Sequence, residues 1–146
     1  MDTKPVVVGV DGSPDSLQAL RWAAEYAQQV EAPLHALAVY ELPTIYGPAA
    51  MAGFQDSHDL EQDARAMLPE AVRTALGPEA KVTERVERGH PAQNLVEASH
   101  DAQLVVVGSR GRGGFAGMLL GSVSQQCVTR ARCPVIVMPH DASAEK

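Results

Sequence analysis

The segment from residue 103 to residue 124 carries the residues best suited to chemistry, and that chemistry is the binding of a phosphate or a similar anion. Its sequence is QLVVVGSRGRGGFAGMLLGSVS. Glycines lack a Cβ, so main-chain N–H groups between them can approach a ligand closely and form a concave anion site. Arg110 and Arg112 add positive charge. Ser122 stands where the N-cap of a following helix is expected, so its hydroxyl and the helix N–H groups would face the same anion.

A flexible surface loop would also be rich in glycine, but two features argue against that interpretation. Phe115, Met118, Leu119 and Leu120 are too apolar for a solvated linker. The glycines also follow an apolar run directly and precede a predicted helix, instead of joining two domains. The segment is therefore interpreted as functional.

Two common phosphate motifs do not fit this segment. The Walker-type P-loop ends in Gly-Lys-Ser/Thr, and the segment contains no lysine. Gly111, Gly113 and Ala116 match the spacing of the dinucleotide fingerprint, but the region about twenty residues further on holds Arg130 and Arg132 in place of the acid that binds the ribose. We regard the second match as accidental.

The spacing that does fit is Gly108-x2-Gly111-x9-Gly121-Ser122, with the run SRGRGG inside it. Together with VVVGVDGSPDS near the amino terminus and CPVIV near the end, this pattern resembles the universal stress protein family in its ATP-binding branch. The resemblance covers nearly the whole chain, apart from the segment 41–56. It implies a parallel sheet of strand order 3-2-1-4-5, a bound ATP, and a homodimer that pairs last strands about a two-fold axis.

The elements that must position this segment alternate along the chain. Nearly continuous apolar runs predict strands buried on both faces, and the alternating residues 81–87 predict a polar strand at a sheet edge. Ser13 and Pro14 predict the N-cap and first position of a helix, and Gly77-Pro78 predicts the end of another. Prolines and glycines in Tyr40 to Gln55 predict an irregular excursion. The predicted strands are 4–10, 33–39, 81–87, 104–107 and 134–138, and the predicted helices begin at residues 14, 57, 91 and 122.

This alternation predicts a doubly wound α/β domain of five parallel strands with right-handed crossovers. In the strand order that the resemblance implies, strands one and four are neighbours whose crossovers leave to opposite sides, and a ligand crevice opens at their carboxyl ends. Asp11 follows strand one and Gly108 ends strand four. A carboxylate is repelled by phosphate, so Asp11 would accept hydrogen bonds from ribose hydroxyls or coordinate a phosphate-bound Mg²⁺. An Asx turn at Asp11-Gly12 would explain the aspartate equally well.

The resemblance adds roles for individual residues. It implies that Asp11 contacts the ribose with Gly108 nearby, and that main-chain groups around Val39 read the adenine edge. Gly9 is expected to permit close packing beside the site, and the arginines are either phosphate partners or solvated. The full predicted set of nucleotide-binding residues is Gly9, Asp11, Val39, Gly108, Arg110, Gly111, Arg112, Gly113, Gly121, Ser122, Val123 and Ser124.

Length, composition and charge limit which other functions are compatible with the sequence. At 146 residues the chain fits one domain, with a core at about 4–139 and a polar tail at 140–146. The net charge of −6 argues against general nucleic-acid binding, which depends on clustered Lys and Arg. No apolar run approaches the roughly 20 residues of a membrane span, and no secretion signal stands at the amino terminus, so we expect a cytoplasmic protein.

Little in the sequence predicts catalysis. The five histidines are scattered singly, and Cys127 and Cys133 alone do not make a zinc site, so both thiols are interpreted as packed. No nucleophile elbow and no acid placed to orient water on a γ-phosphate is evident. The leading hypothesis is therefore an ATP-binding stress-response or signalling module with at most slow hydrolysis. The alternatives are an ATPase or nucleotidyl-transfer enzyme, and a cyclic-AMP-binding or nucleotide-free chaperone-like scaffold.

The apolar strand Pro134 to Met138, at the sheet edge, predicts the homodimer contact.

Overall fold

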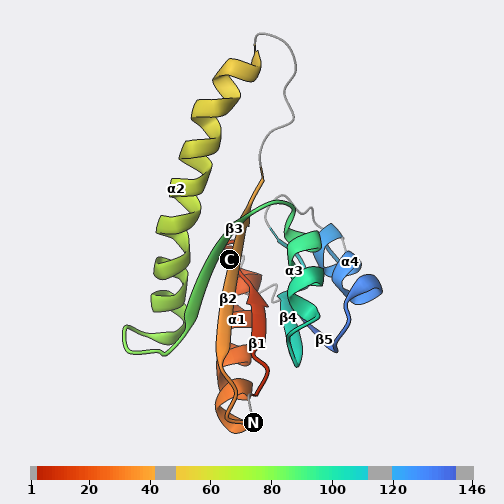
Figure 1. Ribbon diagram of the computed structural model, residues 1–146. Coiled ribbons are helices and arrows are strands. Elements are labelled where there is room, and N and C mark those ends of the chain that lie inside the picture. Colours follow the sequence, from red (N-terminus) through yellow and green to blue (C-terminus); the bar gives the residue numbers. More distant parts are fainter. Residues whose placement is uncertain (1–2, 42–48, 112–119, 141–146) are drawn as a thin grey trace.

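The sheet of the computed structural model is parallel and has the strand order β3-β2-β1-β4-β5 (Figure 1). The structure describes residues 3–41, 49–111 and 120–140, and for residues 49–58 the backbone alone. This order confirms the predicted fold class. The elements are β1 Val6–Gly9, α1 Pro14–Gln29, β2 Leu34–Tyr40, α2 Ala49–Leu76, β3 Thr83–Arg88, α3 Pro91–Ser99, β4 Leu104–Gly108, α4 Ser122–Arg130 and β5 Val135–Met138.

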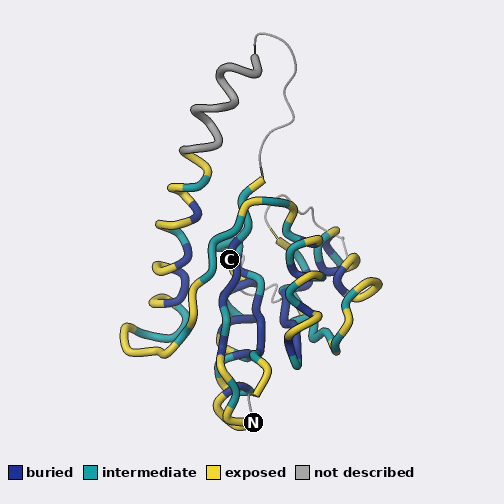
Figure 2. The backbone as a smooth tube through the Cα atoms, viewed as in Figure 1, coloured by how far each residue is buried: buried dark blue, intermediate teal, exposed yellow. Residues whose placement is uncertain are grey.

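Two layers of helices cover the sheet, and each encloses its own apolar core. Residues of α1 and α2 pack with one face of the sheet, and residues of α3 and α4 pack with the other. The valines of β1 and β4 are buried, as the apolar runs predicted, and the polar strand β3 lies at an edge. Figure 2 shows the buried residues concentrated along the central strands and the exposed ones along the outer side of α2.

Local sequence signals set the start of α1 and the end of α2 as predicted. The Ser13 hydroxyl accepts the Ser16 N–H at 3.2 Å and caps α1, and Pro14 occupies its first turn. At the end of α2, Gly77 adopts φ +91° and donates its N–H to the Arg73 carbonyl at 2.9 Å. Only glycine takes this left-handed conformation without steric cost, so the chain turns there toward β3.

The prediction of an irregular segment from Tyr40 to Gln55 is wrong for Tyr40, which ends β2, and for its last seven residues, which are helical, while residues 42–48 lie outside the described residues. Helix α2 begins at Ala49, well before the predicted start near Ser57. The strong helix breakers Pro43, Gly47 and Pro48 all precede Ala49, while the sequence Ala-Ala-Met-Ala that follows favours a helix. Gly53 costs a helix about 1 kcal/mol, which a helix of this length tolerates.

The order of the strands creates a switch point beside β1. Strand β1 pairs with β2 on one side and with β4 on the other, and the helices that follow β1 and β4 lie on opposite faces of the sheet. The loops that leave the two strands therefore diverge, and a crevice opens between the strand ends. Within the described ranges, no helix combines the length and the apolar character needed to cross a bilayer.

Candidate nucleotide site

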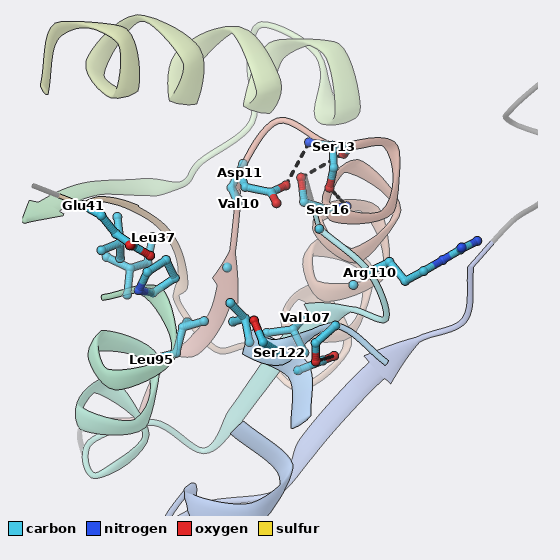
Figure 3. Close-up of a pocket in the computed structure, with 18 residues that line it drawn as sticks. Val10, Asp11, Ser13, Ser16, Leu37, Glu41, Leu95, Val107, Arg110 and Ser122 are labelled. Atoms are coloured by element: carbon cyan, nitrogen blue, oxygen red, sulfur yellow. Dashed lines mark hydrogen bonds between the residues drawn. The ribbon is translucent and has the colours of Figure 1, made fainter. Parts of the chain in front are cut away.

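A cavity of about 550 Å³ lies at the carboxyl ends of β1 and β4 (Figure 3). Its walls come from four regions: the turn from β1 into α1, the end of β2, the start of α3, and the two ends of the glycine-rich loop between β4 and α4. The lining residues are Gly9, Val10, Asp11, Ser13, Ser16, Leu37, Val39, Glu41, Pro91, Leu95, Val107, Gly108, Arg110, Gly111, Gly121, Ser122, Val123 and Ser124. This volume falls in the range of small-molecule sites, about 300–1,000 Å³.

The structure brings the predicted site residues together, as far as it describes them. Arg112 and Gly113 lie outside the described residues. All the others line the cavity: Gly9, Asp11, Val39, Gly108, Arg110, Gly111, Gly121, Ser122, Val123 and Ser124. These residues come from separate stretches of the chain and meet because the carboxyl ends of parallel strands share one edge of the sheet.

Asp11 forms the Asx turn that the sequence offered as one explanation. Its Oδ1 accepts the Ser13 N–H at 2.9 Å, and Gly12 has φ +84°, which suits glycine. The carboxylate also lies against the opposite loop. A Cβ placed on Gly111 would stand 2.6 Å from Asp11 Oδ2, so the loop can come this close because residue 111 has no side chain.

The two ends of the glycine-rich loop are joined at Ser109. The Ser109 carbonyl accepts the Gly121 N–H at 2.6 Å and the Ser124 hydroxyl at 3.0 Å. The same hydroxyl reaches the Gly121 carbonyl at 3.0 Å. The main chain of residues 109–111 is thereby held next to the start of α4, so that both stretches border the cavity.

Ser122 is not the N-cap that the sequence predicted. Gly121 takes that position with extended φ and ψ of −73° and 167°, and Ser122 is the first residue of α4. The shift by one residue arises because Gly121, not Ser122, has the extended conformation of a cap. The first N–H groups of a helix have no partner within the helix and carry a partial positive charge. Ser122, Val123 and Ser124 supply these groups at the cavity wall, which suits an anion.

Gly108 and Gly9 permit close packing around the cavity. A Cβ on Gly108 would lie 2.7 Å from Asp15 Cβ and 3.0 Å from the Asp15 carbonyl carbon, so β4 meets α1 without room for a side chain. A Cβ on Gly9 would lie 3.0 Å from Leu95 Cδ1. Figure 3 shows the Arg110 side chain extending away from the other labelled residues.

The sequence interpretation missed an apolar wall and a buried acid. Leu37, Leu95 and Val107 line the cavity, and strand alternation places Leu37 on the same face of β2 as the predicted Val39. That alternation could have found Leu37, whereas α3 gave no comparable signal for Leu95. Asp15 lies beneath the loop and is 4% exposed, and the sequence offered no sign of its long-range contacts.

The described residues offer no group of three or more His, Cys, Asp or Glu side chains that could hold a metal ion by themselves. Burial, followed by the charge of Cys133, raises the pKa of the Cys127 thiol to about 11. Burial is also the main cause that raises the pKa of Cys133. Both thiols are therefore mostly protonated at neutral pH and are weak nucleophiles.

Comparisons with known proteins agree with this fold. Residues 2–139 match the sequence model of the universal stress protein family. A universal stress protein of Mycolicibacterium smegmatis is 43% identical over 140 residues, which cover 92% of this chain and 45% of the relative. The chain thus spans about half the length of the curated relatives it matches, from 44% to 48% among the first eight.

Solved structures show the same architecture. A universal stress protein in complex with cAMP is 27% identical with a TM-score of 0.62, and the match covers 97% of this chain and 100% of that one. The hypothetical protein MJ0577 has a TM-score of 0.80 at 19% identity, covering 97% of this chain and 99% of that one. At 19% identity the match to MJ0577 shows the fold alone.

Proposed function

This chain belongs to the universal stress protein family, and from that premise we propose that it binds ATP in the cavity between β1 and β4. It would act as a nucleotide-dependent module of stress response or signalling. The observation that carries the proposal is the meeting of the α4 N-terminus, the ends of the glycine-rich loop and Asp11 around one cavity. We also propose a cytoplasmic location, where ATP is supplied.

In this proposal the polyphosphate lies on main-chain N–H groups. Those at the start of α4 and around Gly111 donate to phosphate oxygens, and the Ser122 hydroxyl adds a side-chain donor. Because the loop ends are already joined through Ser109, the donors need little reorganisation when the anion binds. Arg112 and Gly113 remain proposed members of the same loop.

The nucleoside would lie toward β2 and α3. Asp11 would accept hydrogen bonds from the ribose hydroxyls or meet a Mg²⁺ that the phosphates hold, and its Asx turn keeps the carboxylate at the cavity wall. Leu37 and Leu95 would pack against the base while the main chain near Val39 reads its edge. An apolar wall with a few polar groups is the usual composition of such a subsite.

Isothermal titration of the purified protein with Mg-ATP tests the proposal directly. Gly121→Val and Ser122→Ala should weaken binding while the circular dichroism spectrum and melting temperature stay close to those of the wild type. Asp11→Asn should also weaken binding, whereas Asp59→Asn, at an exposed position on α2, should not. Normal ATP affinity in Gly121→Val would count against the site. Mass spectrometry of any small molecule released on denaturation identifies the ligand independently.

Cyclic AMP is the second candidate ligand, because the solved relative at 27% identity is in complex with cAMP. The two nucleotides share the adenine and the ribose, but ATP has a chain of three phosphates whereas cAMP has one phosphate closed onto the ribose 3′ oxygen. Parallel titrations distinguish them, since ATP should bind more tightly if the α4 N-terminus holds the outer phosphates. A flat titration with Mg-ATP beside a saturable one with cAMP would select the second candidate.

Hydrolysis, if present, should be slow. The carboxylates among the described lining residues are Asp11 and Glu41, and the first is already engaged in the Asx turn. A true ATPase or transferase would show multiple turnovers that one acidic substitution abolishes. We expect Glu41→Gln to leave the slow background rate unchanged.

We further propose a homodimer through β5. Within the described sheet β5 pairs with β4 alone. The carbonyls of Pro134 and Met138 accept N–H groups from the β4 side, so by alternation the N–H of Val137 points to the outer edge. Val137→Pro should therefore block edge pairing without removing a bond to β4. Size-exclusion chromatography with light scattering should show a dimer for the wild type and a monomer for this variant.

A further inference from the structure

Asp15 is a buried acid outside the cavity lining, at the point where the glycine-rich loop begins. It lies in the first turn of α1 and is 4% exposed. A carboxylate this deeply buried is unstable in a fold unless hydrogen-bond donors surround it. The partners of Asp15 come from two segments that are far away in the sequence, which marks it as a junction.

The first segment is the start of the glycine-rich loop. Asp15 Oδ2 accepts the main-chain N–H of Arg110 at 3.2 Å and the Ser109 hydroxyl at 3.3 Å. The Ser109 carbonyl also accepts the Gly121 N–H and the Ser124 hydroxyl. The contact with Asp15 therefore fixes the residue that joins both ends of the loop. One carboxylate therefore holds residues 109 and 110, at the start of the loop, against α1.

The second segment follows the last strand. His140 Nδ1 lies 2.9 Å from Asp15 Oδ1 and 3.1 Å from Oδ2, and the imidazole is 21% exposed. A carboxylate only accepts hydrogen bonds, so Nδ1 carries the hydrogen in this contact. The Ser109 N–H also donates to the Met138 carbonyl at 2.9 Å. The end of β5 thus holds both the acid and the loop that the acid supports.

We propose that Asp15 is the positioning residue of the phosphate-binding loop and that His140 holds its carboxylate in place. Asp15 turns the Arg110 N–H inward, so that the following amide at Gly111 is presented to the cavity. The inference rests on the proposed binding of a nucleotide at this loop. N–H donors that are fixed before binding lose little conformational entropy when the phosphate binds. Asp15 can therefore raise the affinity for the nucleotide without contacting it.

The variants that test this proposal are Asp15→Asn, His140→Ala and His140→Asn. The asparagine amide can place a donor close to the position of Nδ1, so His140→Asn should retain the contact that His140→Ala removes. His100→Ala and Asp101→Asn, at exposed positions after α3, are the matched controls. His140→Ala tests the network even if Asp15→Asn does not fold.

Two measurements separate a positioning role from a structural one. In the nucleotide-free protein, amide hydrogen exchange at Arg110 should accelerate about tenfold in Asp15→Asn and His140→Ala, and should stay near the wild-type rate in His140→Asn and the controls. Affinity for ATP should fall about tenfold in the first two variants, as expected for a weakened charge-assisted hydrogen bond. Affinity for adenosine, which lacks phosphates, should stay unchanged.

The outcomes distinguish this inference from the function it builds on. Unchanged exchange at Arg110 in both Asp15→Asn and His140→Ala overturns the positioning role, whatever the protein binds. Equal losses of ATP and adenosine affinity overturn it as well, because the effect would then be general destabilisation. Accelerated exchange in a protein whose wild type binds no ATP removes the proposed function but supports Asp15 as the residue that fixes the loop.

Discussion

Adding one methyl group at Gly108 or at Gly121 should have opposite consequences, although both glycines belong to the same motif. At Gly108 a Cβ would stand 2.7 Å from Asp15 Cβ, 3.0 Å from the Asp15 carbonyl carbon and 3.1 Å from its oxygen. At Gly121 the nearest atoms would be 3.5 Å away or further, at Ser109, Arg110 and Gly111. The first position is closed by the Cβ and the main chain of Asp15, and the second admits a methyl group at ordinary van der Waals distance.

The distances set the expected magnitudes. Carbon atoms pack at about 3.5–4.0 Å, so Gly108→Ala overlaps the start of α1 by most of an ångström, and backbone must move to relieve it. Overpacking of this kind costs about 1–3 kcal/mol, or roughly 3–10 °C in melting temperature for a chain of this size. Gly121 has φ −73°, which any residue adopts, so Gly121→Ala should cost less than about 1 kcal/mol.

Urea unfolding followed by circular dichroism, with ATP titration on the same preparations, measures both effects. Gly108→Ala should unfold at lower urea with an unchanged slope, and Gly121→Ala should unfold close to the wild type. The methyl at residue 121 would stand beside the Gly111 amide, so ATP affinity should fall in this stable variant. A Gly108→Ala protein as stable as the wild type would refute the close contact between β4 and α1 on which the description of the site depends.

Three further predictions follow from single contacts. Ser13→Ala removes the acceptor that caps Ser16 N–H and should lower the free energy of unfolding by about 1 kcal/mol in chemical denaturation, while Ser13→Asp should retain most of it. Burial, then the charge of a neighbouring arginine, lowers the pKa of His35 below its ordinary 6.5. Below about pH 6.5 His35 therefore binds a proton more readily in the unfolded chain than in the folded one, so the free energy of unfolding should decline as pH falls. His35→Leu should reduce this pH dependence of the free energy of unfolding in urea titrations. In native protein a disulfide reagent should modify the half-exposed Cys133 before the buried Cys127; equal rates would contradict the burial that raises the pKa of Cys127.

The sequence was sufficient for the fold because each element carries its own local signal. The valine runs of β1 and β4, the Ser13-Pro14 start of α1 and the glycine at residue 77 each act over a few residues. Local signals also place Asp11 and Gly108 at the carboxyl ends of their strands, but bringing those two ends together required the strand order. The strand order itself came from family resemblance, because local patterns do not say which strands are neighbours.

What the sequence could not provide depends on contacts over long distances or on small differences in conformation. Asp15 and His140 are 125 residues apart, and nothing near either residue in the sequence points to the other. The choice of Gly121 over Ser122 as the N-cap depends on how the loop is joined at Ser109. The early start of α2 at Ala49 differs from the prediction because Gly53, which indicates an irregular segment in the sequence, lies inside the helix among residues that favour it.

Asp11 shows why a structural and a functional interpretation of one residue need not compete. The sequence offered an Asx turn or a ligand contact as separate explanations, yet a carboxylate has two oxygens and about four acceptor positions. Oδ1 accepts the Ser13 N–H, which fixes the side chain at the cavity wall with Oδ2 toward Gly111. The turn is therefore what aims the carboxylate. Asp11→Asn can keep the turn, because its amide oxygen still accepts the Ser13 N–H, but it removes the charge. If the turn were the sole role of Asp11, ATP affinity in Asp11→Asn would equal that of the wild type, and a loss without a change in melting temperature would show that the turn serves the ligand.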